Sequence, residues 1–199
     1  NGRSDNGGLP LDGERYSIHD IIIDGIDGSK YNGPGQFAEI EQGLGAPLLQ
    51  NVTITHVTGF APHSVFGIGS NIANQKMANF MLTNNLLNAG SYPVWSTGGG
   101  TKNCAYWNKP ITTFSACFSP YLFNNNVMIS IPANLTPATW PSGNLFPSDP
   151  TVVEFVNYNN GNGGDYHLLS SSPYKSAGTD GKDLGADVDA VNAAISGAQ

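Results

Sequence analysis

Charged residues are scarce in this chain, and basic ones especially so. Only 12% of the 199 residues are charged, against about 25% in an average soluble domain. The eight lysines and arginines do not cluster, and the net charge is −7. Because binding to a phosphate backbone depends on a basic surface, we expect no nucleic-acid partner.

Long apolar runs are missing as well. No stretch approaches the roughly 18 consecutive apolar residues of a transmembrane helix, so we expect no transmembrane segment. No signal peptide is visible, and the chain opens on the polar run Asn1-Gly2-Arg3-Ser4-Asp5-Asn6-Gly7-Gly8. We interpret the chain as a processed or truncated piece of a longer protein. We expect that its signal peptide was removed or lies upstream, and that the protein is secreted or held at the cell surface.

Cysteine is limited to Cys104 and Cys117. The even count, the short spacing and an intervening segment rich in Gly, Asn and Thr predict a disulfide in a secreted protein. The alternative is two reduced, buried thiols. Closing a loop of this size would stabilise the fold by roughly 3 kcal/mol on the entropic account. Two cysteines alone are too few ligands for a structural zinc site.

Asn, Gly, Ser and Thr take the place of the missing charges. Asn and Gly accept left-handed backbone conformations at turns, which is typical of a turn-rich β protein. Asparagine side chains can also form ladders, in which each amide bonds to the next strand of a stack.

One strand-and-turn phrase occurs twice. Asn51-Val52-Thr53-Ile54-Thr55-His56-Val57-Thr58 is followed 28 residues later by Asn79-Phe80-Met81-Leu82-Thr83-Asn84-Asn85-Leu86. Alternation of apolar and polar residues predicts a strand with one buried face. Related phrases lie 31 residues before, at Asp20-Ile21-Ile22-Ile23-Asp24-Gly25, and 41 residues after, at Tyr121-Leu122-Phe123-Asn124-Asn125-Asn126-Val127. Recurrence of this kind indicates a repeat architecture.

These spacings predict an all-β fold, a right-handed parallel β-helix (solenoid) of about four coils. We attribute the long third spacing to a loop between Cys104 and Cys117 that is pushed out of one coil. The expected organisation is an irregular segment over 1–16, coils over 17–131, and a loop-rich C-terminal cap over 132–199. The cap ends in a short helix that Asp187 caps and whose apolar face holds Val188, Val191 and Ile195.

The last part of the chain resembles the C-terminal portion of secreted bacterial right-handed parallel β-helix repeat proteins. The residues that carry the resemblance are Asp165-Tyr166-His167-Leu168, Ser172-Pro173-Tyr174, Ala177-Gly178-Thr179-Asp180-Gly181 and Asp183-Leu184-Gly185-Ala186. The phrases that begin at Asn51 and at Leu82 resemble the coils of the same proteins. The resemblance covers most of residues 17–190 and implies an extracellular or cell-envelope protein. No lyase or hydrolase signature is present, so it transfers no catalytic residue.

Acidic residues supply the candidate catalytic and metal sites. Glu39 and Glu41 lie on one face of a predicted strand, roughly 7 Å apart, a spacing compatible with a glycosidase carboxylate pair. With Asp24 they could instead bind calcium through oxygen ligands, with Asp27 beside them. A second calcium candidate is the run Asp180, Asp183, Asp187 and Asp189. The simpler interpretation of all these residues is a solvated strand face, turns and helix caps.

Exposed aromatic residues supply the candidate carbohydrate site. The main candidates for sugar binding are Trp95, Tyr106 and Trp107, and further candidates are Tyr92 and Trp140. Sugar rings stack their apolar faces on aromatic rings. The alternative for Tyr106 and Trp107 is local packing of their loop. His63 follows a proline at a turn and is a third weak catalytic candidate, whereas His56 falls where the next phrase has Asn84 and is expected to pack at a turn.

Two functions of different class follow. The first is an extracellular protein that binds or acts on polysaccharide, for which calcium is the candidate cofactor. The second is a non-catalytic structural protein of the cell surface, in which an open first strand leads to self-association and head-to-tail filaments.

Overall fold

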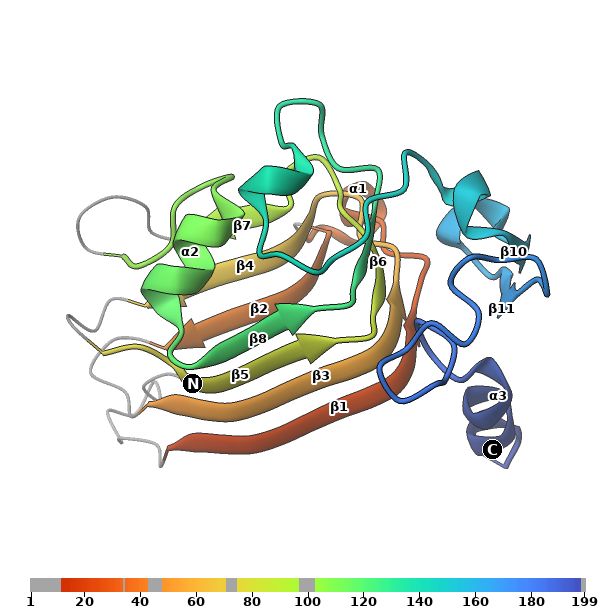
Figure 1. Ribbon diagram of the computed structural model, residues 1–199, viewed down its shortest axis with the longest axis horizontal. Coiled ribbons are helices and arrows are strands. Elements are labelled where there is room, and N and C mark those ends of the chain that lie inside the picture. Colours follow the sequence, from red (N-terminus) through yellow and green to blue (C-terminus); the bar gives the residue numbers. More distant parts are fainter. Residues whose placement is uncertain (1–11, 34, 43–47, 71–74, 97–102, 198–199) are drawn as a thin grey trace.

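The computed structural model describes residues 12–33, 35–42, 48–70, 75–96 and 103–197. Its largest sheet is curled and holds six parallel strands (Figure 1). These strands are β1 (Gly13–Ile23), β3 (Leu49–Gly59), β5 (Ala78–Thr83), β6 (Leu86–Asn88), β8 (Tyr121–Asn124) and β9 (Val127–Ile129). β3 is the longest internal strand, and it pairs with β1 on one side and with both β5 and β6 on the other.

A separate sheet of three parallel strands packs over the first. It consists of β2 (Gln36–Gln42), β4 (Ser64–Ser70) and β7 (Val94–Ser96). Its inward side chains share one hydrophobic core with those of the larger sheet, including Ile54, Phe66, Ile68 and Phe80. On the opposite face Glu39 of β2 is exposed and Trp95 of β7 half-buried, whereas every residue of the central strand β4 is buried.

Short helices and irregular segments complete the chain. They are the helices α1 (Gly28–Tyr31), α2 (Pro110–Cys117) and α3 (Val188–Ser196), the 3-10 turns Pro137–Thr139, Pro150–Val153 and Asn159–Gly161, and the antiparallel pair β10 (Phe155–Asn157) and β11 (Asp165–Leu168). In the part of the chain that the structure describes, no helix is long and apolar enough to cross a membrane.

The prediction of a right-handed parallel β-helix solenoid of about four coils is wrong. A solenoid adds one strand to every sheet with each coil. Here the segment that supplies β8 and β9 to the curled sheet adds, among the described residues, no strand beside β7. The chain instead forms helix α2 after β7 and the proline-rich segment 132–150 after β9. Proline cannot continue a central ladder. The result is a curled sheet, a smaller sheet and an antiparallel pair rather than stacked coils.

The disulfide segment is also not pushed out of the fold. Its helix α2 buries Phe114, which contacts Phe66, Phe80 and Phe123 at centroid distances of 5.9, 6.2 and 4.6 Å. Figure 1 shows α2 at the open end of the space between the two sheets. The insertion therefore closes the core.

Corner residues set the register of the curled sheet. The spacings of 28 and 41 residues are those of the paired strands, but β1 lies 36 residues before β3 rather than 31. The residues that align are those with left-handed backbone, where the strands bend. Asp20, His56, Asn84 and Asn125 form one such column, with φ between 50° and 60°. β1 also begins at Gly13, four residues before the expected Ser17.

Asparagine ladders run across the strands as expected. Asn79 donates to Asn51 and Asn125 donates to Asn84, each over 2.8 Å. A third ladder is buried: Asn85 Nδ2 donates to Asn126 Oδ1 over 2.8 Å, and Asn126 Nδ2 to Asn144 Oδ1 over 2.9 Å. These amides satisfy one another and nearby backbone groups inside the fold, which is the condition for burying them.

The C-terminal segment crosses the corner column. Asn84 Oδ1 accepts from Thr179 N, Gly185 N donates to the Asn84 carbonyl, and Asp187 N donates to Asp20 Oδ1. Asp187 then caps α3 through Ala190 N at 3.0 Å, as predicted. Within α3 only Val188 is buried, and Ile195 stays 61% exposed, so the expected apolar face is only partly covered.

Candidate functional site

Four aromatic side chains meet at one end of the three-stranded sheet. His63 precedes β4, Tyr92 precedes β7, Trp95 lies in β7 and Trp107 lies in the disulfide segment. Tyr92, Trp95 and Trp107 have mutual centroid distances of 5.6–6.1 Å. The His63 ring lies 5.3 Å from Tyr92 and 5.0 Å from Trp95. We call these four residues the aromatic cluster.

The aromatic cluster is accessible from solvent. Trp107 is 56% exposed and Tyr92 39%, while Trp95 and His63 are half-buried beneath them. Large aromatic rings that remain this exposed while contacting one another form a rigid apolar surface with polar edges. Such a surface suits a ligand that is itself partly apolar and partly polar.

Backbone contacts fix Tyr92 relative to His63. Tyr92 N donates to the His63 carbonyl over 2.7 Å, and Ser91 N donates to the Pro62 carbonyl over 3.2 Å. Gly90 has φ +70°, and a Cβ there would lie 2.7 Å from the His63 carbonyl oxygen. Only glycine fits this close approach at positive φ, so the turn that carries Tyr92 is held in one conformation.

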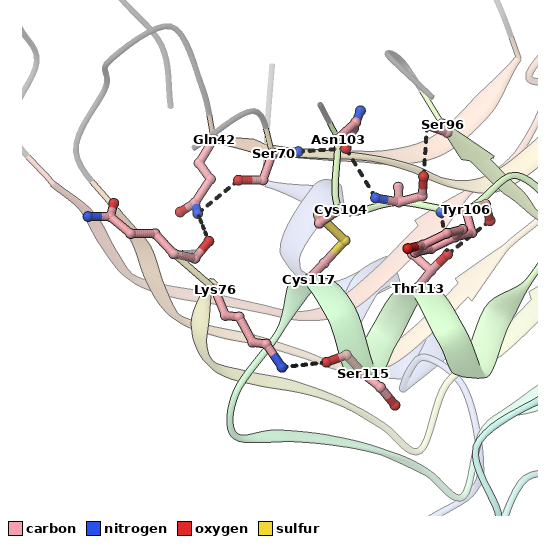
Figure 2. The surroundings of a disulfide bond; sticks show 12 residues. Gln42, Ser70, Lys76, Ser96, Asn103, Cys104, Tyr106, Thr113, Ser115 and Cys117 are labelled. Atoms are coloured by element: carbon pink, nitrogen blue, oxygen red, sulfur yellow. Dashed lines mark hydrogen bonds between the residues drawn. A yellow bond between two sulfur atoms is a disulfide. The ribbon is translucent and has the colours of Figure 1, made fainter. Parts of the chain in front are cut away.

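The predicted disulfide between Cys104 and Cys117 is confirmed, with a Cα–Cα distance of 5.1 Å (Figure 2). It joins the start of the segment that carries Trp107 to the end of α2. Cys104 N also donates to the Ser70 carbonyl over 3.2 Å, which ties the segment to β4. Asn103 Oδ1 accepts from Ser70 N and from Ala105 N at 3.1 Å.

The residues on either side of Trp107 are equally constrained. Thr113 Oγ1 donates to the Tyr106 carbonyl and accepts from Tyr106 N, both at 2.9 Å, as drawn in Figure 2. Asn108 N donates to the Val94 carbonyl of β7 over 3.0 Å. Trp107 is thus held between two anchored residues, beside Trp95. Tyr106 is 47% exposed but makes no ring contact with the described members of the aromatic cluster.

The outward face of the same sheet continues away from the aromatic cluster. Register places Glu39 of β2 beside Gly67 of β4, and Gly67 beside Trp95 of β7. Ile40 follows Glu39 and Phe66 precedes Gly67, and both point into the core, so Glu39, Gly67 and Trp95 share the outer face. The space over Gly67 is taken by the Gln36 amide, whose nitrogen and oxygen lie 3.2 Å from where a Cβ would be.

The predicted catalytic residues are distributed over this region. Glu39 is exposed, and Glu41 lies one pair further along, beside Gly69. His63 belongs to the aromatic cluster, and its Nδ1 is 3.3 Å from Ser64 Oγ. A catalytic role for Glu39, Glu41 or His63 stays a prediction.

The predicted calcium site of Asp24, Glu39 and Glu41 is not assembled. Asp24 Oδ2 instead accepts from Tyr166 Oη and from Gly163 N, both at 2.7 Å. Partial burial, together with this carboxylate, raises the pKa of Tyr166 to about 12. Among the residues that the structure describes, no group of three or more His, Cys, Asp or Glu is placed to hold a metal ion. Asp27 serves as the N-cap of α1.

The other acidic candidates have structural partners as well. Asp180 Oδ2 lies 3.0 Å from His56 Nε2, Asp183 pairs with Lys175 at 2.9 Å, and Asp189 lies 3.2 Å from His167 Nε2. Trp140, a further carbohydrate candidate, is 2% exposed and packs on Phe123 in the core. Neither the acidic run nor Trp140 therefore contributes to the exposed site.

His167 links β11 to α3 between two carboxylates. Its Nδ1 is 2.5 Å from Asp165 Oδ1 and its Nε2 3.2 Å from Asp189 Oδ1. The hydrogen bond with Asp165, aided by Asp189, raises the pKa of His167 above its ordinary value although burial opposes the shift. The protonated ring is therefore the form that holds α3.

The link predicts a pH dependence of stability. Because the pKa of His167 is higher in the folded state, protonation of its ring stabilises the fold. This contribution is complete below the ordinary pKa of about 6.5 and is lost as pH rises through the folded-state pKa. We expect the melting temperature to fall between pH 5.5 and pH 8.5, and to fall less in His167→Gln. Differential scanning fluorimetry at both pH values tests this, and equal decreases in the two proteins would contradict it.

Comparison with known proteins gives no relative. No protein-family model, no curated protein and no solved structure shows a significant match to this chain. The aromatic cluster and the sheet face beside it are therefore the features of the structure that bear on function.

Proposed function

We propose that this protein is an extracellular carbohydrate-binding protein and that the aromatic cluster is its contact surface. The observation that carries the proposal is the set of three exposed or half-exposed rings, Tyr92, Trp95 and Trp107, within 6.1 Å of one another. The C–H faces of pyranose rings stack on aromatic rings, while hydroxyl groups hydrogen-bond at their edges. Two or three neighbouring rings suit a chain of sugars.

The support around the cluster favours ligand binding over incidental exposure. Gly90, the Cys104–Cys117 disulfide and the Thr113 hydrogen bonds all restrict the segments that carry the rings. A surface that is ordered before binding loses less entropy when the ligand arrives. The disulfide also accords with an oxidising, extracellular setting.

Self-association into filaments has less support. A head-to-tail contact would need a free edge at both ends of the curled sheet. At β9 that edge is occupied, because Val127 forms a bridge with Leu145 and Met128 N donates to the Leu145 carbonyl over 2.8 Å. On β1 the left-handed residues Arg15 and Asp20 interrupt the extended edge. The filament hypothesis stays a prediction.

The test is calorimetric titration with soluble hexasaccharides of glucose, N-acetylglucosamine, glucosamine and galacturonate. For the best ligand, Trp107→Ala should weaken binding about 30-fold, which corresponds to the roughly 2 kcal/mol of a hot-spot residue. Tyr16→Ala is the matched control, since Tyr16 is also exposed, at 49%, but lies on β1. Absence of binding to all four sugars, or equal effects of the two variants, would overturn the proposal.

A further inference from the structure

The sheet face beside the aromatic cluster places an acidic side chain near the proposed glycan surface. Across three adjacent strands the outer positions are Glu39, Gly67 and Trp95. Two strand spacings separate the outer members, about 10 Å between their Cα atoms. The middle strand presents no side chain of its own there, because the residue is glycine.

This row has the parts of a sugar subsite. Trp95 supplies an aromatic wall that is continuous with Trp107 and Tyr92. The Gln36 amide lies over Gly67 and can both donate and accept hydrogen bonds. Glu39 supplies an exposed carboxylate on the opposite side.

Building on the carbohydrate-binding function proposed above, we infer that this subsite selects a cationic amino sugar, as in a polymer of glucosamine. A glucosamine unit stacked on Trp95, with the Gln36 amide over Gly67 beneath it, would direct its ammonium group to the Glu39 carboxylate. A cation beside Trp95 is also attracted to the face of the indole ring. A uronate unit in this subsite would instead bring a second negative charge close to Glu39.

The net charge of the whole chain also favours a cationic ligand. A net charge of −7 attracts a polycation and repels polyanions such as polyuronates. The basic residue nearest to the cluster in the described sequence is Lys109, a single exposed side chain two positions after Trp107. It does not form the basic surface that an anionic polysaccharide would require.

The experiment compares two ligands with the same sugar backbone, one with free amino groups and the other with neutral acetylated ones. Glucosamine hexamer and N-acetylglucosamine hexamer are titrated into the whole protein by calorimetry, at a pH where the free amines are protonated. We expect glucosamine hexamer to bind about fivefold more tightly, as one exposed charge pair allows. The preference should shrink in 0.5 M salt, which screens exposed charges.

Three variants separate the possible outcomes. Glu39→Gln should remove the fivefold preference, whereas the matched control Glu14→Gln, which makes the same charge change on β1, should keep it. Trp107→Ala should weaken both hexamers alike. A preference that is absent, or that survives Glu39→Gln, would overturn the amino-sugar inference and leave carbohydrate binding intact. Failure of both hexamers to bind, with binding of neutral glucose hexamer retained, would overturn it too, whereas loss of all glycan binding would overturn the proposed function itself.

Discussion

Replacing Asn126 with alanine is expected to destabilise the fold by about 4 kcal/mol, because each buried group left without a partner costs about 1–3 kcal/mol. Asn126 is fully buried. Its Oδ1 accepts from Asn85 N at 3.2 Å and from Asn85 Nδ2 at 2.8 Å. Its Nδ2 donates to the Leu82 carbonyl at 2.8 Å and to Asn144 Oδ1 at 2.9 Å. Alanine would leave the buried Asn85 N without this acceptor and would leave a cavity at a fully buried position, while Asn85 Nδ2 and Asn144 Oδ1 each lose one of several partners.

Urea unfolding measures the effect, and Asn88→Ala is the control. Asn88 is only partly buried and makes a single side-chain bond, to the Ala61 carbonyl at 3.2 Å, so its loss should cost about 1 kcal/mol. If the two variants lose the same stability, the buried ladder does not hold the strands together as described. An unchanged m-value in both variants would show that the loss is one of stability alone.

Replacing Phe114 with alanine is expected to cost about 4 kcal/mol, in the range for truncating a buried phenylalanine. The ring is fully buried and contacts Phe66, Phe80, Phe118 and Phe123. It fills the end of the core between the two sheets, where a solenoid would have placed a further strand. Its loss leaves a cavity that the rigid strands can close only partly.

The matched control lies in the same helix. Ile111 is 44% exposed, and Ile111→Ala should change stability by less than about 1 kcal/mol. Guanidinium unfolding under oxidising conditions, with the disulfide intact in both variants, compares them. A small loss in Phe114→Ala would mean that α2 rests on the surface of the core rather than closing it.

Local signals in the sequence predicted much of the strand pairing. The recurring phrase placed β3 beside β5, and the asparagine positions indicated the ladders, because both depend on residues that repeat at one spacing. The register of β1 was misjudged because the apolar run Ile21–Ile23 was aligned instead of the corner residue Asp20. Left-handed backbone at Asp20 and His56 sets that register, and Asp is not distinctive enough in sequence to reveal it.

The architecture beyond the repeat was harder to predict from the sequence. A solenoid is the natural extrapolation of a repeat, but it assumes that every turn of the chain contributes to both sheets. The helix at Pro110–Cys117 and the role of Phe114 as core follow from tertiary packing, which short-range periodicity does not encode.

The candidate site was predicted in part. Trp95 and Trp107 were chosen for exposure and chemistry, and the structure brings them together with Tyr92 and His63. Gly67 and Gln36 were missed. Alternation in Ser64–Ser70 could have revealed Gly67, because it places the glycines on the side opposite Phe66 and Ile68. The Gln36 contact depends on a side-chain conformation and had no sequence signal.

The most direct test of glycan binding by the aromatic cluster uses the three tryptophans of the chain as probes. In a proton–nitrogen NMR spectrum each indole N–H gives its own signal, assigned by single Trp→Phe substitutions. On titration with the best-binding hexasaccharide, we expect the Trp95 and Trp107 signals to shift together in a saturable manner. The signal of Trp140, which is 2% exposed in the core, should stay in place. Binding that leaves the Trp95 and Trp107 signals unchanged would contradict the assignment of the aromatic cluster as the glycan site.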